Sequence, residues 1–264
     1  MSIPIAVIGG SGLSTVLDPT SAESLSVPTP YRTVEVLVGE LGGRTVAFVP
    51  RHGAGHSVPP HRIDSRATVW ALASLGVHAI ISTAAVGSIN TELPVGRLVV
   101  VDQYLDRTNG RQDTFYEGPD VQHLPSAEPF CPELRTIAAS TLGPDVSVGA
   151  TVAVIQGPRF STRAESRWLA AAGADLLNMT LYPEVPLAAE LNIGTLTLAF
   201  VTDEDAADDA DPVDAALVFA RLAEAKPRIV DAIERIVAAV PVDYRARTLI
   251  SAAAVERVLQ RRTS

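Results

Sequence analysis

The chain has 264 residues, of which 47% are hydrophobic, and it carries a formal net charge of -9 at pH 7. This size and composition allow one extended hydrophobic core, and no linker, repeat or low-complexity run divides the sequence. We therefore predict a single domain over residues 1–264. The acidic balance argues against a nucleic-acid partner, because binding to a phosphate backbone needs clustered Lys and Arg.

The cysteine count and the hydropathy pattern narrow the class of protein further. Cys131 is the only cysteine, so an intrachain disulfide or a thiolate metal cluster is not possible. No apolar run is long enough to span a bilayer, and the start lacks the basic segment of a signal peptide. We expect a cytoplasmic protein without a membrane partner.

In chain order, short β-branched runs alternate with Ala- and Leu-rich helical patterns, which indicates an α/β fold around a largely parallel sheet. The expected strands are 5–8, 34–38, 45–49, 79–82, 98–101 and 148–155, with the second and third paired as a hairpin around Gly42-Gly43. The expected helices are 62–75, 132–142, 163–172, 212–240 and 244–262. Pro227 is expected to kink or break the fourth helix. The long passage 106–129, rich in Gly, Pro and polar residues, is predicted to be a functional or interface element.

Two polar groups that follow apolar runs are the most informative feature of the chain. One is the stretch Asn178–Glu184, and the other is Thr202–Asp205. Each is expected at the end of a strand, where open α/β sheets bind ligands. The alternative is that Asn178 and Thr180 form a helix-capping turn and that the carboxylates lie in a solvated loop.

Three further segments after predicted strands have the composition of an anion site. Gly9–Leu13 offers backbone amides and the Ser11 hydroxyl, 50–53 offers Arg51 and His52 as donors, and 83–88 offers small residues with exposed amides. The first does not complete a dinucleotide fingerprint, because Thr15 stands where the third glycine belongs. For Arg51 the alternative is a surface ion pair, and for 83–88 it is a simple tight turn.

Together these segments resemble a known family. The motifs IGGSGL, PRHG, STAAVGS, VDQYLDRT, AEPFCP, QGPRFSTRAE, NMTLYPE and TDED are similar, in this order, to those of the 5′-methylthioadenosine phosphorylases within the purine nucleoside phosphorylase family. The resemblance implies a three-layer α/β/α fold with a mixed, largely parallel sheet. It implies a pentosyltransferase of purine and methionine salvage that uses phosphate as co-substrate and needs no metal or organic cofactor.

The same resemblance assigns binding roles to individual residues. It places phosphate against Ser11, Arg51, His52, Ala84, Ala85 and Thr180; the nucleoside against Phe160, Ser161, Asn178 and Met179; and the 5′ substituent against Val213, Ala216 and Leu217. Relatives commonly carry Thr where Ala84 stands and a bulkier residue where Ala216 stands, which implies one hydroxyl fewer and a roomier pocket. His123 matches a residue that reaches into a neighbouring subunit, which implies a homotrimer or a dimer of trimers. The alternatives are core packing for Met179, loop packing for Phe160 and a plain surface position for His123.

Two aspartates carry the predicted chemistry. A purine leaves more easily when its imidazole nitrogen is protonated, and the resemblance makes Asp203 the acid and Asp205 the acceptor from a 6-amino group. The expected substrate is therefore S-methyl-5′-thioadenosine, and the alternative is a purine nucleoside phosphorylase acting on adenosine or on 6-oxopurine nucleosides. A nucleosidase would use water and would not need Arg51 and His52. A noncatalytic nucleoside sensor is the other alternative.

Overall fold

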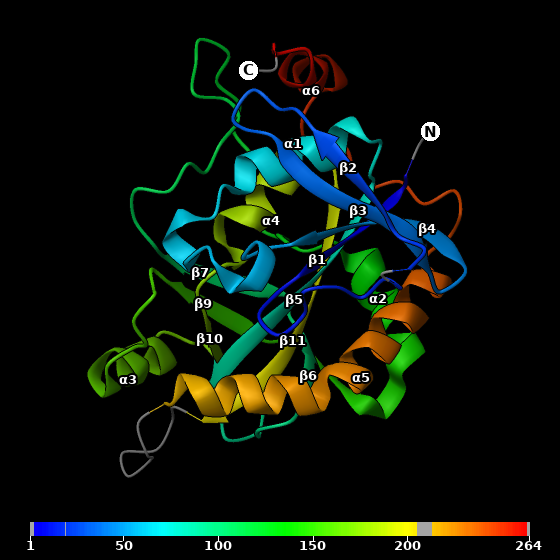
Figure 1. Ribbon diagram of the computed structural model, residues 1–264. Helices are drawn as coiled ribbons and strands as arrows, with labels where there is room; N and C mark the ends of the chain where they lie inside the picture. Colours follow the sequence, from blue (N-terminus) through cyan, green and yellow to red (C-terminus); the bar gives the residue numbers. More distant parts are fainter. Residues whose placement is uncertain (1–2, 19, 205–212, 263–264) are drawn as a thin grey trace.

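The computed structural model describes residues 3–18, 20–204 and 213–262. Within these ranges the strands form one sheet with helices on both of its faces (Figure 1). The strands are β1 Ile5–Gly9, β2 Glu23–Val27, β3 Val34–Leu41, β4 Arg44–Pro50, β5 Ala79–Ser88, β6 Leu98–Val100, β7 Gln103–Arg107, β8 Val146–Val148, β9 Thr151–Ile155, β10 Leu176–Asn178 and β11 Gly194–Glu204. The helices are α1 Ser65–Ser74, α2 Pro132–Leu142, α3 Arg163–Ala171, α4 Leu181–Glu190, α5 Ala215–Ala239 and α6 Ala252–Leu259.

The sheet is mixed, and its centre is parallel. Strand β1 pairs in parallel with β4 and β5, and β5 pairs in parallel with β11 along its length. The hairpin of β3 and β4 is antiparallel, as the sequence predicts, and β2 extends it at the edge. Strand β10 runs antiparallel to the far end of β5. The predicted three-layer α/β/α fold is therefore confirmed.

The two largest hydrophobic clusters of the described residues lie on opposite faces of this sheet. Along β1 the side chains alternate: Ile5 and Val7 pack in the core under α2 and α5, whereas Ala6 and Ile8 pack in the core under α1, α4 and α6. This period-2 burial on both faces explains why the central strands read as continuous apolar runs.

The predicted strand 148–155 is wrong as one element, since the structure has the two strands β8 and β9 there. Gly149 separates them with φ of 87°, a backbone conformation that glycine adopts at little cost. Strand β8 pairs with β6, whereas β9 pairs with β7 and β10. The glycine turn thus lets the chain cross from one part of the sheet to another.

Three helices differ from the sequence prediction at their ends or their interior. Helix α1 begins at Ser65, because the Asp64 carboxylate caps it by accepting from the Ala67 N–H at 3.0 Å. Helix α5 continues as one helix past Pro227, and its axis changes direction along its length in Figure 1, so of the predicted kink or break the structure has no break. Helix α6 spans only Ala252–Leu259; the preceding segment instead packs Tyr244 into the core.

The passage predicted at 106–129 is mostly irregular, although its first two residues belong to β7. It is fixed to α4 by Glu190, whose buried carboxylate accepts from the Phe115 N–H at 2.7 Å and from the Thr114 hydroxyl at 2.6 Å.

Among the described residues, no helix is both long and apolar enough to cross a membrane.

Candidate active site

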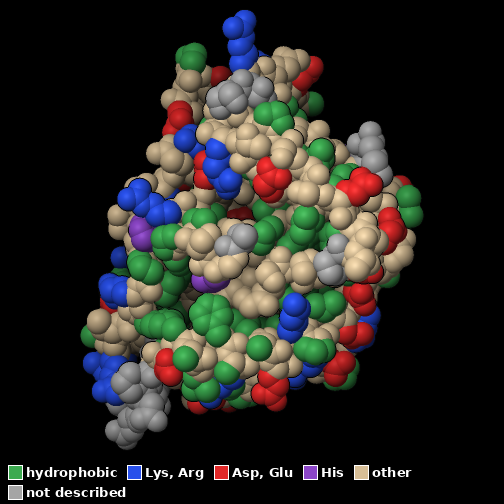
Figure 2. Space-filling view, viewed as in Figure 1, with side chains coloured by type: hydrophobic (Ala, Val, Ile, Leu, Met, Phe, Trp, Pro, Cys, Tyr) green, Lys and Arg blue, Asp and Glu red, His purple; other side chains and the backbone are tan. Residues whose placement is uncertain are grey.

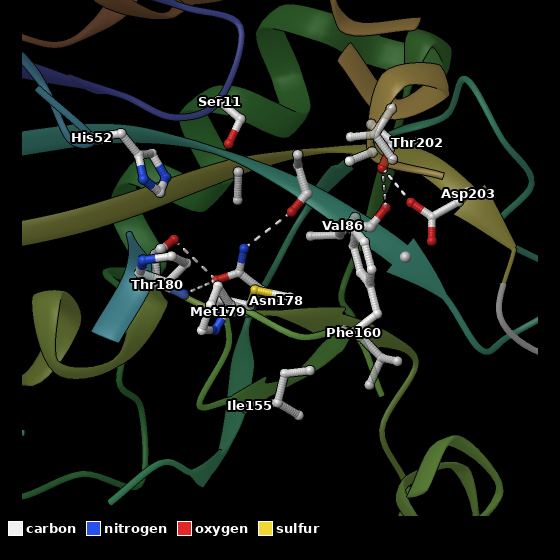
Figure 3. A pocket seen from close by; sticks show the side chains of 18 of the residues that line it. Ser11, His52, Val86, Ile155, Phe160, Asn178, Met179, Thr180, Thr202 and Asp203 are labelled. Atoms are coloured by element: carbon white, nitrogen blue, oxygen red, sulfur yellow. Dashed lines mark hydrogen bonds between the residues drawn. The ribbon is translucent and has the colours of Figure 1, made fainter. Parts of the chain in front are cut away.

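A cavity of about 240 Å³ lies where β4, β5, β10 and β11 lead into loops, under the start of α5. In Figure 2, hydrophobic and histidine side chains gather around a hollow in the middle of the face, and most charged side chains lie around it. Most of the predicted site residues line this cavity: Ser11, Arg51, His52, Ala84, Ala85, Phe160, Ser161, Asn178, Met179, Thr180 and Asp203. Figure 3 shows Ser11, His52 and Thr180 at one end, Phe160 and Asp203 at the other, and Met179 between them.

Arg51 is buried at the first end and has a partner that the sequence prediction did not assign to it. Its Nε and Nη2 donate to the two carboxylate oxygens of Glu184 at 2.7 and 2.8 Å, and its Nη1 donates to the carbonyl oxygen of Thr83 at 2.7 Å. The edge of the guanidinium formed by Nε and Nη2 is thus occupied by a carboxylate, and the predicted contact of Arg51 with phosphate is left to its two remaining N–H groups. The expected alternative of a surface ion pair is wrong, since both side chains are buried.

His52 follows Arg51 and is held as a neutral ring. Its Nδ1 lies 2.9 Å from the carbonyl oxygen of Val58, which can only accept, so Nδ1 carries the proton. Burial lowers the pKa of His52 to about 4, which leaves Nε2 as an acceptor at neutral pH. The sequence predicts His52 as a second donor to an anion, whereas the neutral ring offers Nε2 as an acceptor. His56, which the sequence prediction passed over, stacks on this ring with centroids 4.0 Å apart and meets Phe219 edge-on at 5.2 Å.

Asn178 shapes the turn between β10 and α4. Its side-chain oxygen accepts from the N–H groups of Thr180 at 2.7 Å and Leu181 at 2.9 Å, and its amide nitrogen donates to the carbonyl oxygen of Ala85 at 3.1 Å. The capping alternative raised by the sequence is thus confirmed for Asn178, and the same turn brings Thr180 to the cavity. The capping role and the cavity-lining role therefore do not exclude each other, because the hydrogen bonds of Asn178 fix the turn that places Thr180 in the cavity wall.

Met179 lies midway along the cavity, and Arg111 forms a hydrogen bond to its backbone. The Nη2 of Arg111 donates to the carbonyl oxygens of Met179 at 2.9 Å and Gln156 at 3.0 Å, and Nη1 donates to that of Tyr182. Arg111 lies in the long irregular passage. This contact ties the passage to the cavity floor, a link with no signature in the local sequence.

The second end of the cavity is more open. Phe160 is 40% exposed and lines the cavity together with Pro158 and Ser161, in the segment between β9 and α3. A capping box starts α3, in which the Thr162 hydroxyl accepts from the Glu165 N–H and the Glu165 carboxylate accepts from the Thr162 N–H. The box fixes where the loop ends, so that Phe160 and Ser161 face the cavity.

Asp203 reaches the cavity through an irregularity in β11. The register of β11 on β5 shifts between Val201 and Asp203, and such bulges re-aim side chains. The Asp203 carboxyl then lies 2.6 Å from the Thr202 hydroxyl, which is also 3.1 Å from the carbonyl oxygen of Val86. Gly87 makes room for it, because a Cβ at Gly87 would stand 2.7 Å from an Asp203 oxygen. Asp205 lies outside the described residues.

The α5 residues that line the cavity differ from those that the sequence assigns to the 5′ substituent. Val213, Ala216 and Leu217 do not line the cavity; Ala215, Val218 and Phe219 do. Both sets have the spacing of residues on one face of a helix, and each residue that lines the cavity stands two positions after the one that the sequence predicts. His123 is exposed on the described chain and also stands apart from the cavity. The wall remains apolar, as predicted.

Comparisons with known proteins show the family of the chain. The model of the phosphorylase superfamily matches residues 4–238. The S-methyl-5′-thioadenosine phosphorylase of Mycolicibacterium smegmatis is 49% identical over 204 residues, covering 76% of this chain and 77% of that protein. The protein of the same name from Pyrococcus furiosus is 43% identical over 242 residues, covering 90% and 93%.

Solved structures give the same result for the fold. Methylthioadenosine phosphorylase from Schistosoma mansoni in complex with adenine superposes with a TM-score of 0.86 at 30% identity and covers 98% of both chains. A methylthioadenosine phosphorylase from an antarctic soil metagenomic library has a TM-score of 0.83 at 34% identity, with 98% and 99% covered. The chain therefore belongs to the phosphorylase superfamily, within its S-methyl-5′-thioadenosine phosphorylase family.

Proposed function

We propose that the protein catalyses the phosphorolysis of S-methyl-5′-thioadenosine to adenine and 5-methylthioribose 1-phosphate. One observation carries this reading beyond the family relationship: a single cavity has polar donors at one end, an aromatic ring and a carboxyl at the other, and Met179 between them. A nucleoside with phosphate under its sugar needs these three parts in this order. The apolar residues Ala215, Val218 and Phe219 suit a methylthio group, because burying an unpaired hydroxyl there costs roughly 1–3 kcal/mol.

In the proposed reaction a phosphate oxygen attacks C1′ of the ribose, and the bond from C1′ to the purine nitrogen breaks with its electron pair moving into the base. Asp203 gives its proton to the imidazole-ring nitrogen of the purine, which leaves as the neutral base. Ser11, Thr180, Arg51 and the backbone at Ala84 and Ala85 hold phosphate in line, so their contribution is positioning and electrostatic stabilisation. His52, as a neutral ring with Nε2 unprotonated, accepts a hydrogen bond from a phosphate or sugar hydroxyl. Asp205 is proposed to accept from the 6-amino group.

Product analysis tests this function directly. Purified protein is incubated with S-methyl-5′-thioadenosine, adenosine and inosine, each with and without inorganic phosphate, and the products are separated. We expect adenine and the sugar phosphate from the first substrate only when phosphate is present. Base release without phosphate would establish a nucleosidase, no release would leave a binding protein, and efficient cleavage of inosine would replace the substrate with a 6-oxopurine nucleoside.

We also propose that the working form is a trimer, or a dimer of trimers, in which His123 of one subunit completes the 5′ pocket of the next. The support is the open, partly exposed wall around Phe160 and the long passage that Arg111 ties to the cavity floor. Sedimentation at micromolar concentration should give a trimer, and truncating residues 106–129 should remove both assembly and activity. A fully active monomer would overturn the proposal.

Neither a metal nor an organic cofactor enters the proposed reaction, in which phosphate is a co-substrate. Dialysis against a chelator should therefore leave the activity unchanged. The expected cytoplasmic location stays a prediction, which fractionation of the source cells would test.

A further inference from the structure

Glu184 is a buried carboxylate whose partners connect it to the phosphate end of the cavity. The Arg51 and Glu184 side chains are 2% and 4% exposed, and two hydrogen bonds of 2.7 and 2.8 Å join them in a fork-to-fork pair. They are 133 positions apart in the sequence: Arg51 follows β4, and Glu184 lies in the first turn of α4. The pair therefore joins the two chain segments that supply the phosphate end.

The pair fixes what Arg51 can offer to an anion. A guanidinium has five N–H donors in one plane. Two point at Glu184 and one of the Nη1 hydrogens points at the carbonyl oxygen of Thr83. Among the described residues, this leaves one hydrogen on each terminal nitrogen, and both lie in a plane that Glu184 and Thr83 define. The direction of these two donors is thus set before any ligand binds.

The pair also sets the charge of this end. The carboxylate balances the guanidinium, and His52 is neutral, so the side chains around the phosphate position carry little net charge. Affinity for phosphate must then come mainly from correctly aimed hydrogen bonds, which makes the orientation of Arg51 decisive.

We propose that Glu184 is a positioning residue for inorganic phosphate, acting through Arg51. This inference rests on the proposed role of Arg51 as a phosphate ligand. A purely structural role, in which the pair only holds α4 against β4, would lower stability without a selective effect on phosphate. The two roles therefore separate in a measurement of phosphate affinity.

The test compares wild type with Glu184→Gln, Arg51→Gln and the double variant. Glutamine keeps the shape of Glu184 but turns an amide group toward an Arg51 donor, so one of the two hydrogen bonds is lost and Arg51 moves. Binding of inorganic phosphate alone is measured by calorimetry, and the Michaelis constants of phosphate and nucleoside are measured separately. Glu190→Gln is the matched control, because Glu190 is a second buried carboxylate on α4 whose partners are Thr114 and Phe115.

We expect Glu184→Gln to weaken phosphate binding about tenfold, the scale of one displaced charge-assisted hydrogen bond, with less than a twofold change in the nucleoside Michaelis constant. In the Arg51→Gln background the same change should have no further effect, since the residue acts through Arg51. Glu190→Gln should lower the melting temperature and leave phosphate affinity unchanged. Unaltered phosphate binding in Glu184→Gln, additive losses in the double variant, or no phosphate binding by wild type would each overturn the proposal. The calorimetric measurement uses no nucleoside, so it is independent of whether the proposed reaction takes place.

Discussion

At the end of the cavity proposed to bind phosphate, the phosphate end, the side chains are buried and hydrogen-bonded to other segments, whereas at the end proposed to bind the base, the purine end, they are partly exposed. Counting backbone and side chain together, Arg51 is 6% exposed and Thr180 7%, but Phe160 is 40% exposed. The first end is assembled by contacts between distant segments, such as Arg51 with Glu184 and Asn178 with Ala85. The second is assembled by local devices, which are a bulge in β11 and a capping box before α3. This contrast predicts that substitutions at the first end act on phosphate affinity and on folding together, while those at the second act on turnover and base choice and leave phosphate affinity unchanged.

The largest effect is expected at the purine end, from Asp203→Asn. An amide cannot protonate the leaving purine, and a general acid contributes roughly 10²–10⁴-fold to such a step. We expect kcat/KM for S-methyl-5′-thioadenosine to fall at least ~100-fold, and the wild-type preference of ~100-fold or more over inosine to narrow or reverse. Steady-state kinetics on both substrates provide the check, with phosphate affinity as the internal control. A variant that keeps its full rate on the 6-amino substrate would remove Asp203 from the acid role.

Arg51→Ala tests the other end and should affect both phosphate and stability. The apparent Michaelis constant for phosphate should rise by at least ~10-fold, while that for the nucleoside changes far less. The variant also leaves Glu184 buried without its partner, so the free energy of unfolding should fall by roughly 3–5 kcal/mol. Denaturant titration and kinetics at saturating nucleoside measure the two effects. Unchanged phosphate dependence would rule out the assignment of Arg51.

Gly87→Ala should affect the purine end without a change at the phosphate end. The added Cβ would stand 2.7 Å from an Asp203 oxygen, so the carboxyl must move away. We expect about a tenfold loss in kcat/KM, because a small misplacement of a reacting group is costly. Gly39→Ala on the edge hairpin, where the nearest atom is a flexible Leu17 methyl at 3.3 Å, is the control. Equal losses in the two variants would show that the effect is only on folding.

Phe219→Ala and Leu217→Ala distinguish the wall that the structure shows from the one that the sequence predicts. Phe219 lines the cavity and Leu217 does not. Removing the ring should raise the Michaelis constant for S-methyl-5′-thioadenosine about fivefold relative to adenosine, within the range for lost apolar contact with a small group. Leu217→Ala should leave the ratio unchanged. The opposite pattern would restore the sequence assignment.

The smallest expected effect is the pH dependence that His52 contributes to stability. Burial holds its pKa at about 4 in the folded protein, against 6.5 for an ordinary histidine. Between these values the unfolded chain binds the extra proton, so the contribution of neutral His52 is complete above pH 6.5 and is lost as the pH falls toward 4. As the pH is lowered from 6.5 to 4, the melting temperature of His52→Gln should therefore fall less than that of wild type, and the difference between the two falls should be about 2–4 °C. If the melting temperatures of the two proteins changed with pH in the same way, the assignment of His52 as a buried, neutral ring would be contradicted.

Much of the fold could be predicted from the sequence because its signals are local. The buried strand β1, the β3–β4 hairpin and the whole of α2 follow from an apolar run, turn residues and a proline at the first helical position. The motifs in which Ser11, Arg51, Met179 and Asp203 stand mark the cavity because each ends a strand, and strand ends gather at one edge of a sheet. The residue types at these ends indicated the chemistry of the site before its geometry was known.

Other properties depend on contacts between segments that the sequence leaves far apart. The partner of Arg51 stands 133 positions away, and the protonation of His52 depends on the carbonyl of Val58 and on burial. The phase of α5, which brings Phe219 rather than Leu217 to the cavity, is set by packing of the whole helix against the sheet. Charge, protonation and side-chain direction respond to the surroundings in three dimensions, so they are decided only when the chain has folded.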